Sequence, residues 1–233
     1  QEILPPQRMG GTGAGPNPVH FDNAQQRLAI AALVDASVGV LTGGPGTGKT
    51  TTAAALLAVR HRIDTGLTSD QILVAAPTGR AASRIGEAIA QSAARLTGLT
   101  ESDRAFLSSI ATVTLHRALE WGPEPPEHGG PYRRNALRPL EVRVMLVDEA
   151  SMVDLSLMHA LIKATSPSAS LVLMGDSDQL ESVEVGGVLS ELVQRGSQSN
   201  PDDAVCTRLA ARVGLNASVI AKEIAEALPL QNQ

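Results

Sequence analysis

Short apolar runs alternate along this chain with longer segments whose apolar residues recur at helical spacing. Four runs are continuous enough to predict buried strands, at residues 38–41, 72–76, 142–147 and 171–174. In the helix-like segment after the second run, Ile85, Ile89 and Leu96 would lie on one face. Strands that alternate with helices predict an α/β fold, in which a mostly parallel sheet lies between two layers of helices.

The pattern also predicts elements around these strands. We expect a helix from about residue 23 to residue 34 with Asp22 as its N-cap, and a short strand that enters a helix at 111–117. Asp154 is expected to cap a later helix. The apolar face of that helix would consist of Leu155, Met158, Leu161 and Ile162.

Composition divides the chain into a main domain and two flanking segments. Residues 1–20 are rich in Gly and Pro and indicate a linker or disordered N-terminus, whereas 195–233 have the periodicity of a helical tail. Residues 21–194 form the expected domain, interrupted at about 122–140 by Pro, Gly and basic residues. We expect an exposed insertion there, since such basic runs more often belong to a solvated loop than to a nucleic-acid contact. The basic residues are Arg133, Arg134 and Arg138.

The bulk composition is that of a globular protein, with 43 % hydrophobic and 18 % charged residues. No apolar run is long enough to cross a bilayer. A single cysteine, Cys206, excludes an internal disulfide and a cysteine-built metal site and favours a reducing cytoplasm.

The chain begins with neither a methionine nor a signal-like segment, so we interpret it as a piece of a longer protein. A net charge of −5 and 2 % aromatic residues mean that any contact with nucleic acid must be local.

The stretch Gly43-Gly44-Pro45-Gly46-Thr47-Gly48-Lys49-Thr50 matches the phosphate-binding loop G-x-x-x-x-G-K-[ST] at every fixed position. An apolar run precedes it and a helix-forming run follows. In such loops, backbone N–H groups and the start of the helix surround a phosphate. Lys49 would reach the β- and γ-phosphates, and the Thr50 hydroxyl would ligate Mg²⁺. A glycine-rich turn with a chance lysine is the plain alternative, but the complete pattern in this context predicts that the chain binds ATP and Mg²⁺.

Polar residues follow two of the later apolar runs. Asp148 and Glu149 come directly after 142–147, where Asp148 would hold Mg²⁺ largely through water and Glu149 would deprotonate the attacking water. An acidic turn that caps the next helix is the alternative. After 171–174, Gln179 is a candidate sensor of the γ-phosphate, and Asp176 is a candidate to couple that phosphate to a bound polymer.

Two further candidates have weaker support. Gln26 precedes the phosphate loop, and its amide carries the donor and acceptor that the adenine edge requires; a solvated helix face is an equal alternative. Thr78 lies in the turn after 72–76, at the sheet edge where ligands bind in this architecture. Thr78 and the following helix could hold a DNA phosphate with Arg80 beside them, although an ordinary β–α turn explains the same residues.

Together and in this order, the motifs resemble the RecD-like helicases of superfamily 1B, most closely the RecD (alpha) subunits of exodeoxyribonuclease V. The resemblance covers about residues 21–194. Besides the phosphate loop and Thr51, it rests on Ala-Pro-Thr-Gly-Arg-Ala-Ala at 76–82, Thr-Leu-His-Arg at 114–117, Val-Asp-Glu-Ala-Ser-Met at 147–152 and Gly-Asp-Ser-Asp-Gln-Leu at 175–180.

The resemblance implies a RecA-like P-loop NTPase, the first motor domain of an enzyme that moves 5′→3′ on single-stranded DNA in recombination and double-strand break repair. It implies ATP contacts from the loop and Thr51, catalytic roles for Lys49, Glu149 and Gln179, and a small subdomain in the insertion. The residues that lie where the family contacts DNA are Pro77, Thr78, Thr114 and His116.

After Val193 the sequence departs from the family, which continues into a second RecA-like domain that contributes arginines to the ATP site. An arginine finger is worth about 10³–10⁵ in rate, so we expect the chain alone to bind ATP·Mg²⁺ but to hydrolyse it slowly. The expected partners are that second domain or other subunits of a helicase–nuclease complex. One alternative is a nucleotide-binding assembly module that does not hydrolyse ATP. The other is the helicase-like region of a conjugative relaxase, whose nuclease half would need clustered histidines and catalytic tyrosines; this chain has one tyrosine and no such cluster.

Overall fold

Five parallel strands form the central sheet, in the order β3-β7-β6-β4-β5. The computed structural model describes residues 2–3, 19–20, 24–122, 131–176 and 188–197. One strand separates the strand that precedes the phosphate loop from the strand that Asp148 follows. The strands are β3 (Val38–Thr42), β4 (Ile72–Ala76), β5 (Thr112–Thr114), β6 (Val144–Val147) and β7 (Ser170–Gly175).

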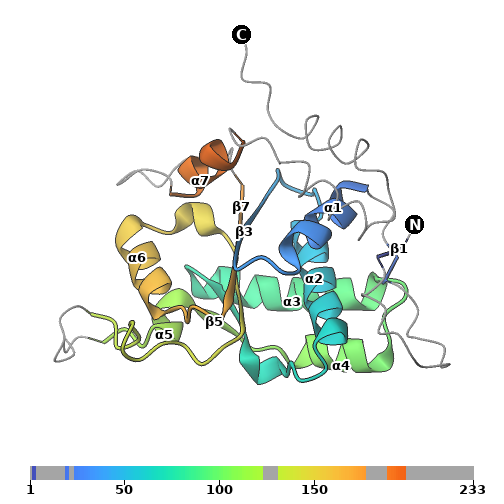
Figure 1. Ribbon diagram of the computed structural model, residues 1–233, viewed down its shortest axis with the longest axis horizontal. Helices are drawn as coiled ribbons and strands as arrows, with labels where there is room; N and C mark the ends of the chain where they lie inside the picture. Colours follow the sequence, from blue (N-terminus) through green and yellow to red (C-terminus); the bar gives the residue numbers. More distant parts are fainter. Residues whose placement is uncertain (1, 4–18, 21–23, 123–130, 177–187, 198–233) are drawn as a thin grey trace, which may run out of the picture.

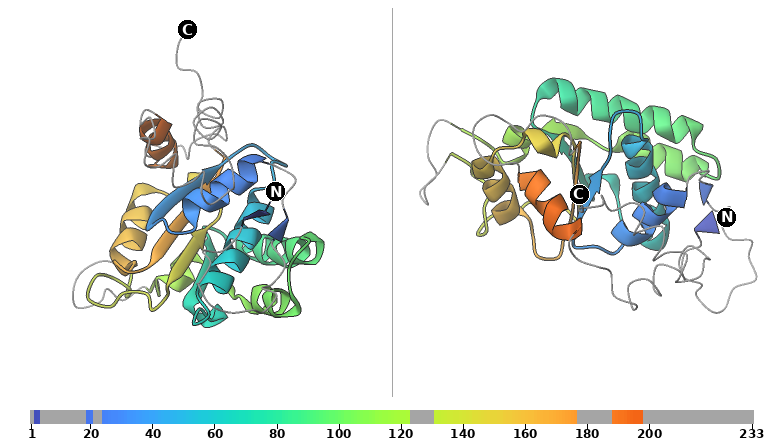
Figure 2. Two further views of the ribbon diagram at one scale, coloured as in Figure 1. Left: turned by 45° about the vertical axis from the view of Figure 1, so that its right-hand side comes forward. Right: turned by 90° about the horizontal axis from the view of Figure 1, so that it is seen from above.

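Helices cover both faces of this sheet, so the described chain has the predicted three layers (Figures 1 and 2). One layer consists of α1 (Ala24–Leu33), α2 (Lys49–Ile63), α3 (Gly79–Arg95) and α4 (Glu101–Ser109). The other consists of α5 (Leu115–Ala118), α6 (Leu155–Ala164) and α7 (Val188–Ser197). Short 3₁₀ turns, η1 (Ser69–Gln71) and η2 (Ala150–Met152), precede β4 and α6. A separate antiparallel pair joins β1 (Glu2–Ile3) to β2 (Val19–His20) within the segment predicted as a linker.

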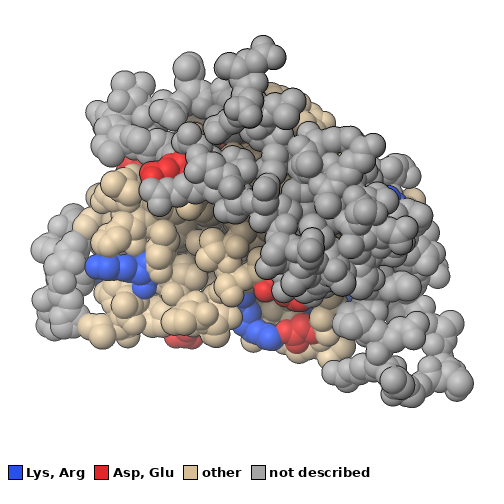
Figure 3. All heavy atoms as spheres, turned by 45° about the horizontal axis from the view of Figure 1, so that its top comes forward, with Lys and Arg blue, Asp and Glu red and all other residues tan. Residues whose placement is uncertain are grey.

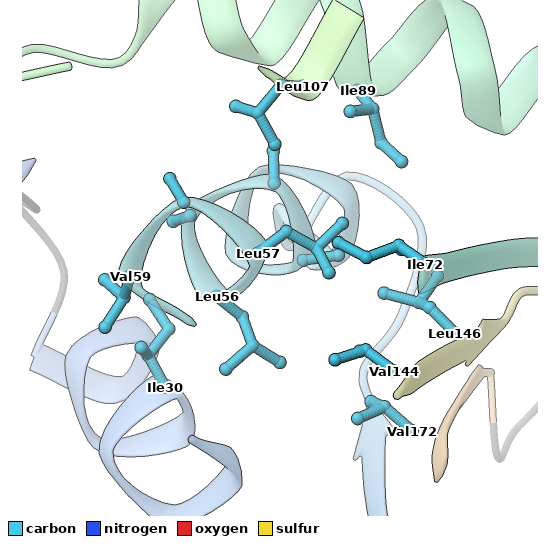
Figure 4. Packing of buried hydrophobic residues seen from close by; sticks show 14 of the residues in the cluster. Ile30, Leu56, Leu57, Val59, Ile72, Ile89, Leu107, Val144, Leu146 and Val172 are labelled. Atoms are coloured by element: carbon cyan, nitrogen blue, oxygen red, sulfur yellow. The ribbon is translucent and has the colours of Figure 1, made fainter. Parts of the chain in front are cut away.

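Strand β6 shows how one apolar run builds two cores. Val144 and Leu146 pack on the side of α2, whereas Met145 and Val147 pack on the side of α6. Successive side chains of a strand point to opposite faces, so a continuous apolar run fits a strand that is buried on both. In the first core, Leu56 and Leu57 of α2 lie between the sheet and the neighbouring helices (Figure 4). This packing fixes α2 directly behind the phosphate loop.

Two sequence predictions about burial are wrong. The strand at 38–41 was expected to be buried, but β3 lies at the edge of the described sheet, and the side chain of Val38 is 63 % exposed. On α6, Met158 and Leu161 are buried as expected, whereas Leu155 and Ile162 are more than half exposed. Leu157 and Ala164 take their places, because the face of α6 that meets the sheet is rotated from the predicted one.

The remaining element predictions agree with the structure where it describes them. Helix α1 occupies most of the predicted 23–34 segment, while its expected cap, Asp22, lies outside the described residues. Asp154 caps α6 by accepting a hydrogen bond from the N–H of Leu157 at 2.8 Å. Most of the tail predicted at 195–233 also lies outside the described residues, and its proposed start falls within α7. None of the described helices is long and apolar enough to cross a membrane.

Candidate functional site

A cavity of about 350 Å³ lies where the sheet meets the phosphate loop, and we call it the strand-end cavity. It brings together the loop, the residues that follow β6, the end of β7 and one side of α3. In parallel α/β sheets, ligands bind at this carboxyl edge. The lining residues are Gly44, Pro45, Gly46, Thr47, Gly48, Lys49, Thr50, Arg84, Ile85, Ala88, Asp148, Glu149, Ser151, Gly175 and Asp176.

The loop has the backbone shape that an anion site requires. Gly46 and Gly48 adopt left-handed conformations with φ of 76° and 85°, which glycine reaches at little cost. The Thr47 hydroxyl donates to the carbonyl of Gly44 at 2.9 Å and braces the turn. Because Gly48 is the N-cap of α2, no side chain caps the first N–H groups of that helix. Those groups and the helix dipole suit a phosphate.

The sequence-predicted loop residues divide between the cavity and its surroundings. Thr50 and Lys49 line the cavity, and the Lys49 ammonium donates to the carbonyls of Gly43 and, at 3.0 Å, Gly44. Thr51 points elsewhere, with its hydroxyl 3.4 Å from that of Ser92 on α3. Thr51 therefore supports the packing of α2 on α3 and does not line the cavity.

Gln26 lies against the back of the loop. Its Nε2 donates to the carbonyl of Thr47 at 3.4 Å, and a methyl group placed on Gly48 would meet the same nitrogen at 2.4 Å. Gln26 is not among the residues that line the cavity. The structure thus brings α1 to the phosphate loop through this side chain, while a contact with adenine stays a prediction.

Asp148 and Glu149 face the cavity from the strand next to β7. Burial raises the pKa of the Asp148 carboxyl above its usual value, and the N–H of Glu149 and the charges of Lys49 and Arg84 oppose that shift only in part. A bound cation would favour the charged form of this buried carboxylate. Glu149 has φ 52° and ψ 39°, a left-handed conformation that is uncommon for a residue with a side chain. Such strain is often found at functional sites.

Oxygen ligands of this kind fit Mg²⁺. The cation takes one or two carboxylates, keeps several waters and shares substrate phosphates. Asp148 and the Thr50 hydroxyl both line the strand-end cavity and supply the carboxylate and the hydroxyl of that set. Within the described chain there is no group of three or more His, Cys, Asp or Glu residues that could hold a metal by itself. A nucleotide that brings its own phosphate ligands is consistent with both observations.

The end of β7 contributes Asp176, which lines the cavity and is 5 % exposed. Gln179, the predicted sensor of the γ-phosphate, lies outside the described residues. Sequence reasoning missed Arg84, which α3 presents to the same cavity together with Ile85 and Ala88. The sequence shows that Arg84 lies on a helix that starts at the sheet edge, but it does not show which side of that helix meets the cavity.

The predicted DNA-contact residues lie at the ends of two adjacent strands. Ala76 of β4 pairs in register with Thr114 of β5, so the turns that follow these strands are neighbours. Thr78 and Thr114 have the same local role: each hydroxyl accepts a backbone N–H at 3.2 Å and caps the following helix. Pro77 lies between the end of β4 and Thr78. Arg80 and His116 are exposed in the first turns of α3 and α5.

An exposed aromatic group beside His116 was not anticipated. Trp121 is 54 % exposed, and its ring meets that of His116 edge-on with centroids 6.3 Å apart. The ring of Tyr132 also lies near the histidine, with centroids 6.1 Å apart. An antiparallel bridge pairs Trp121 with Tyr132 at the base of the insertion. The sequence shows Trp121 and Tyr132 only as two of a few aromatic residues, and the bridge between them brings both close to His116.

Charge near this edge is local rather than broad. Arg134 and Arg138 of the insertion both pair with Glu120, at 2.8 and 3.2 Å. These contacts fit the predicted solvated loop better than a free basic patch. Among the described residues that Figure 3 shows, the Lys and Arg side chains and the Asp and Glu side chains lie in small groups among uncharged ones.

A second cavity, of about 290 Å³, lies at the opposite end of the sheet. Its main cation is Arg60, whose Nη2 donates to the Leu33 carbonyl at 2.6 Å and the Ser170 hydroxyl at 2.8 Å. Burial lowers the pKa of this guanidinium to about 10. The bonds of Arg60 tie α2 to the chain before β3 and to the start of β7. The cavity is therefore a packing feature of the scaffold, remote from the phosphate loop.

Comparisons with known proteins identify the family of this chain. A sequence profile described as an AAA domain matches residues 26–185. The RecBCD enzyme subunit RecD of Mycobacterium tuberculosis is 45 % identical over 194 residues, which cover 82 % of this chain and 32 % of that protein. The ATP-dependent RecD2 DNA helicase of Deinococcus radiodurans is 38 % identical over 170 residues, which cover 73 % of this chain and 20 % of that protein.

Among solved structures, the large terminase of bacteriophage HK97 overlaps with a TM-score of 0.48 at 14 % identity, covering 90 % of this chain and 47 % of the terminase chain. The chain spans about a third or less of the length of the curated relatives above.

Proposed function

Because the chain belongs to the AAA-domain family and is a RecD-like motor domain, we propose that it binds ATP·Mg²⁺ and uses ATP hydrolysis to move along single-stranded DNA. The observation that carries this proposal is the strand-end cavity, where Lys49 and Thr50 of one segment meet Asp148 and Glu149 of another. Phosphoryl transfer needs a phosphate cradle, a metal ligand and a group that orients the attacking water.

In this proposal the roles follow the geometry of the cavity. The loop N–H groups and Lys49 hold the β- and γ-phosphates, which requires the ammonium to exchange its loop carbonyls for phosphate oxygens. Thr50 and Asp148 hold Mg²⁺, and Glu149 takes the proton of the attacking water. Gln26 and Gln179 are proposed to read the adenine and the γ-phosphate. The presence of Glu149 in the cavity favours hydrolysis over a module that only binds nucleotide.

Single-stranded DNA is the proposed track, in the 5′→3′ direction that the resemblance implies. It would cross the ends of β4 and β5, where Pro77, Thr78, Arg80, Thr114 and His116 lie together. Hydroxyls and exposed N–H groups suit backbone phosphates, and such contacts carry little sequence preference. We propose a role in recombination and double-strand break repair, which the resemblance implies, and a location in the cytoplasm, which the single cysteine favours.

The motor would be completed by a partner. The relatives are about three times as long as the matched region or longer, and several are named as subunits of the RecBCD enzyme. We propose that a second motor domain, or other subunits of a helicase–nuclease complex, supplies the arginines that the ATP site needs for fast turnover.

The direct test measures Mg²⁺-dependent binding of a fluorescent ATP analogue, and ATP hydrolysis with and without single-stranded DNA. We expect affinity in the micromolar range for the wild-type chain, loss of that affinity in Lys49→Ala, and slow hydrolysis that rises when a candidate partner is added. Arg95→Gln serves as a control because Arg95 is exposed at the far end of α3. Equal nucleotide affinity in the Lys49→Ala and wild-type chains would contradict the proposal.

A further inference from the structure

Arg84 and Lys49 are the two cations among the described residues that line the strand-end cavity. They enter it from different sides: Lys49 starts α2 behind the loop, whereas Arg84 comes from α3, five residues after that helix begins. Ile85 and Ala88 line the cavity beside Arg84, so this side of α3 forms one wall. Ile85 is also buried in the core, which fixes the helix from which Arg84 extends.

The position of Arg84 relative to Asp148 indicates which part of a nucleotide it would meet. Arg84 and Asp148 line the same cavity, Arg84 from α3 and Asp148 from the chain that follows β6. Asp148 is the proposed metal ligand, and in such sites the ion bridges the β- and γ-phosphate oxygens. A cation that lines the same cavity as the proposed metal ligand can therefore reach the terminal phosphates.

We propose that Arg84 binds the γ-phosphate of ATP from α3 and thereby distinguishes ATP from ADP. This inference rests on the proposed function and assigns a new contact within the same site. Guanidinium suits the role because it stays charged at every physiological pH and its planar fork can bond two phosphate oxygens at once. The guanidinium extends from α3, the helix that Thr78 caps and whose first turn carries Arg80.

The placement has a mechanical consequence for the motor. Arg84 is four residues from Arg80, a separation of about 6 Å along a helix. When hydrolysis removes the γ-phosphate, Arg84 loses this contact. The contact then no longer stabilises the position of α3 beside the cavity. The same helix is capped by Thr78 at the proposed DNA edge. One rigid element thus links the nucleotide state to the grip on DNA, as coupling between two sites requires.

The test compares affinities for a non-hydrolysable ATP analogue and for ADP, both with Mg²⁺, so it does not depend on turnover. In Arg84→Gln we expect the affinity for the ATP analogue to fall about tenfold or more, because a hydrogen bond to a charged group is lost. ADP affinity should stay within about twofold of wild type. Arg84→Lys keeps the charge without the planar guanidinium, so its affinity for the ATP analogue should lie between those of wild type and Arg84→Gln. Arg95→Gln on the same helix is the matched control and should bind both nucleotides as wild type does.

The outcomes separate this inference from the proposed function. If wild type prefers the ATP analogue and Arg84→Gln keeps that preference, Arg84 does not bind the γ-phosphate, while the nucleotide site stands. An equal loss of affinity for both nucleotides in Arg84→Gln would also overturn the inference, since it would indicate a structural role for Arg84. If wild type binds neither nucleotide, the proposed function and the inference both fail. Melting temperatures of the variants establish that each is folded, which the exposure of Arg84 favours.

Discussion

Arg62 of α2 and Asp103 of α4 form an ion pair that is almost closed to solvent. The Arg62 Nη2 lies 2.6 Å from the Asp103 Oδ2, and the two side chains are 10 % and 2 % exposed. The Arg62 Nε contacts both carboxylate oxygens, at 3.2 and 3.1 Å. The backbone N–H and the hydroxyl of Thr100 also donate to Asp103, each at 2.7 Å. The pair therefore fastens α4 to the helix that follows the phosphate loop.

The first prediction concerns the pH dependence of stability. Burial alone would raise the pKa of Asp103, but the bonds from Arg62 and Thr100 outweigh it, so the folded-state pKa lies below the usual value. The unfolded chain then takes up the proton first. The contribution of this carboxylate is complete above about pH 5 and is lost as the pH falls below about 4, through the folded-state pKa.

Thermal unfolding of wild type and Asp103→Asn from pH 7 to pH 3 checks this sign. At pH 7 the variant should lose about 3 kcal/mol, because Arg62 keeps its charge without a charged partner. The difference from wild type should shrink as the pH falls below about 4. Asp70→Asn, at an exposed site in η1, should differ little from wild type throughout. A gap that stays constant down to pH 3 would show that Asp103 is not the titrating group.

A second prediction concerns Gly48. Alanine at this position would need φ near 85° and would push the amide of Gln26 away from the loop. We expect Gly48→Ala to lose about 1–2 kcal/mol of stability from the strained backbone and to weaken ATP binding, since the loop N–H groups would shift.

The double variant Gly48→Ala with Gln26→Ala separates the two causes. Removing the Gln26 side chain relieves the contact but leaves the backbone strain, so stability and ATP affinity should recover only in part. Gly44→Ala is a control for stability alone, because a methyl group there meets open space. Full recovery in the double variant would mean that crowding, and not φ, sets the cost.

Much of this fold was accessible from the sequence because apolar runs and strand-end motifs are local signals. The apolar runs of β4 and β6 are continuous stretches of sequence, and Asp154 caps a helix that begins at the next residue. Packing on distant elements is not encoded in the same way. The rotation of α6, which exposes Leu155 and buries Leu157, depends on how the helix meets the sheet.

The same limit applies to the candidate site. Lys49, Asp148 and Glu149 follow from motifs, and the structure brings them into one cavity. Arg84 enters that cavity only because α3 packs beside α2, a tertiary relationship that no spacing in the sequence reveals. Helix α4 escaped sequence analysis for a related reason: its nine residues are defined by a capping box between Thr100 and Asp103 and by a narrow apolar face.

A third prediction concerns the proposed base. Glu149→Gln keeps the size and the polar contacts of the side chain but cannot accept a proton, so ATP affinity should stay near wild type. Single-turnover hydrolysis should fall by about 10²–10⁴-fold, the usual contribution of general base catalysis. Quench-flow with excess enzyme measures the step directly. Hydrolysis at the wild-type rate in this variant would remove Glu149 from the role.

The last prediction concerns Trp121, whose exposed indole is braced by His116 at the proposed DNA edge. Stacking of one base on an aromatic side chain is worth about 1–3 kcal/mol, so Trp121→Ala should weaken binding of a labelled thymidine oligonucleotide about fivefold or more. The salt dependence should keep its slope, because no phosphate contact is lost. Ile162→Ala on α6 removes an apolar side chain of similar exposure, 56 %, and should bind as wild type does. Equal affinity in Trp121→Ala would place the path of the DNA away from this aromatic group and leave the ends of β4 and β5 as its contact.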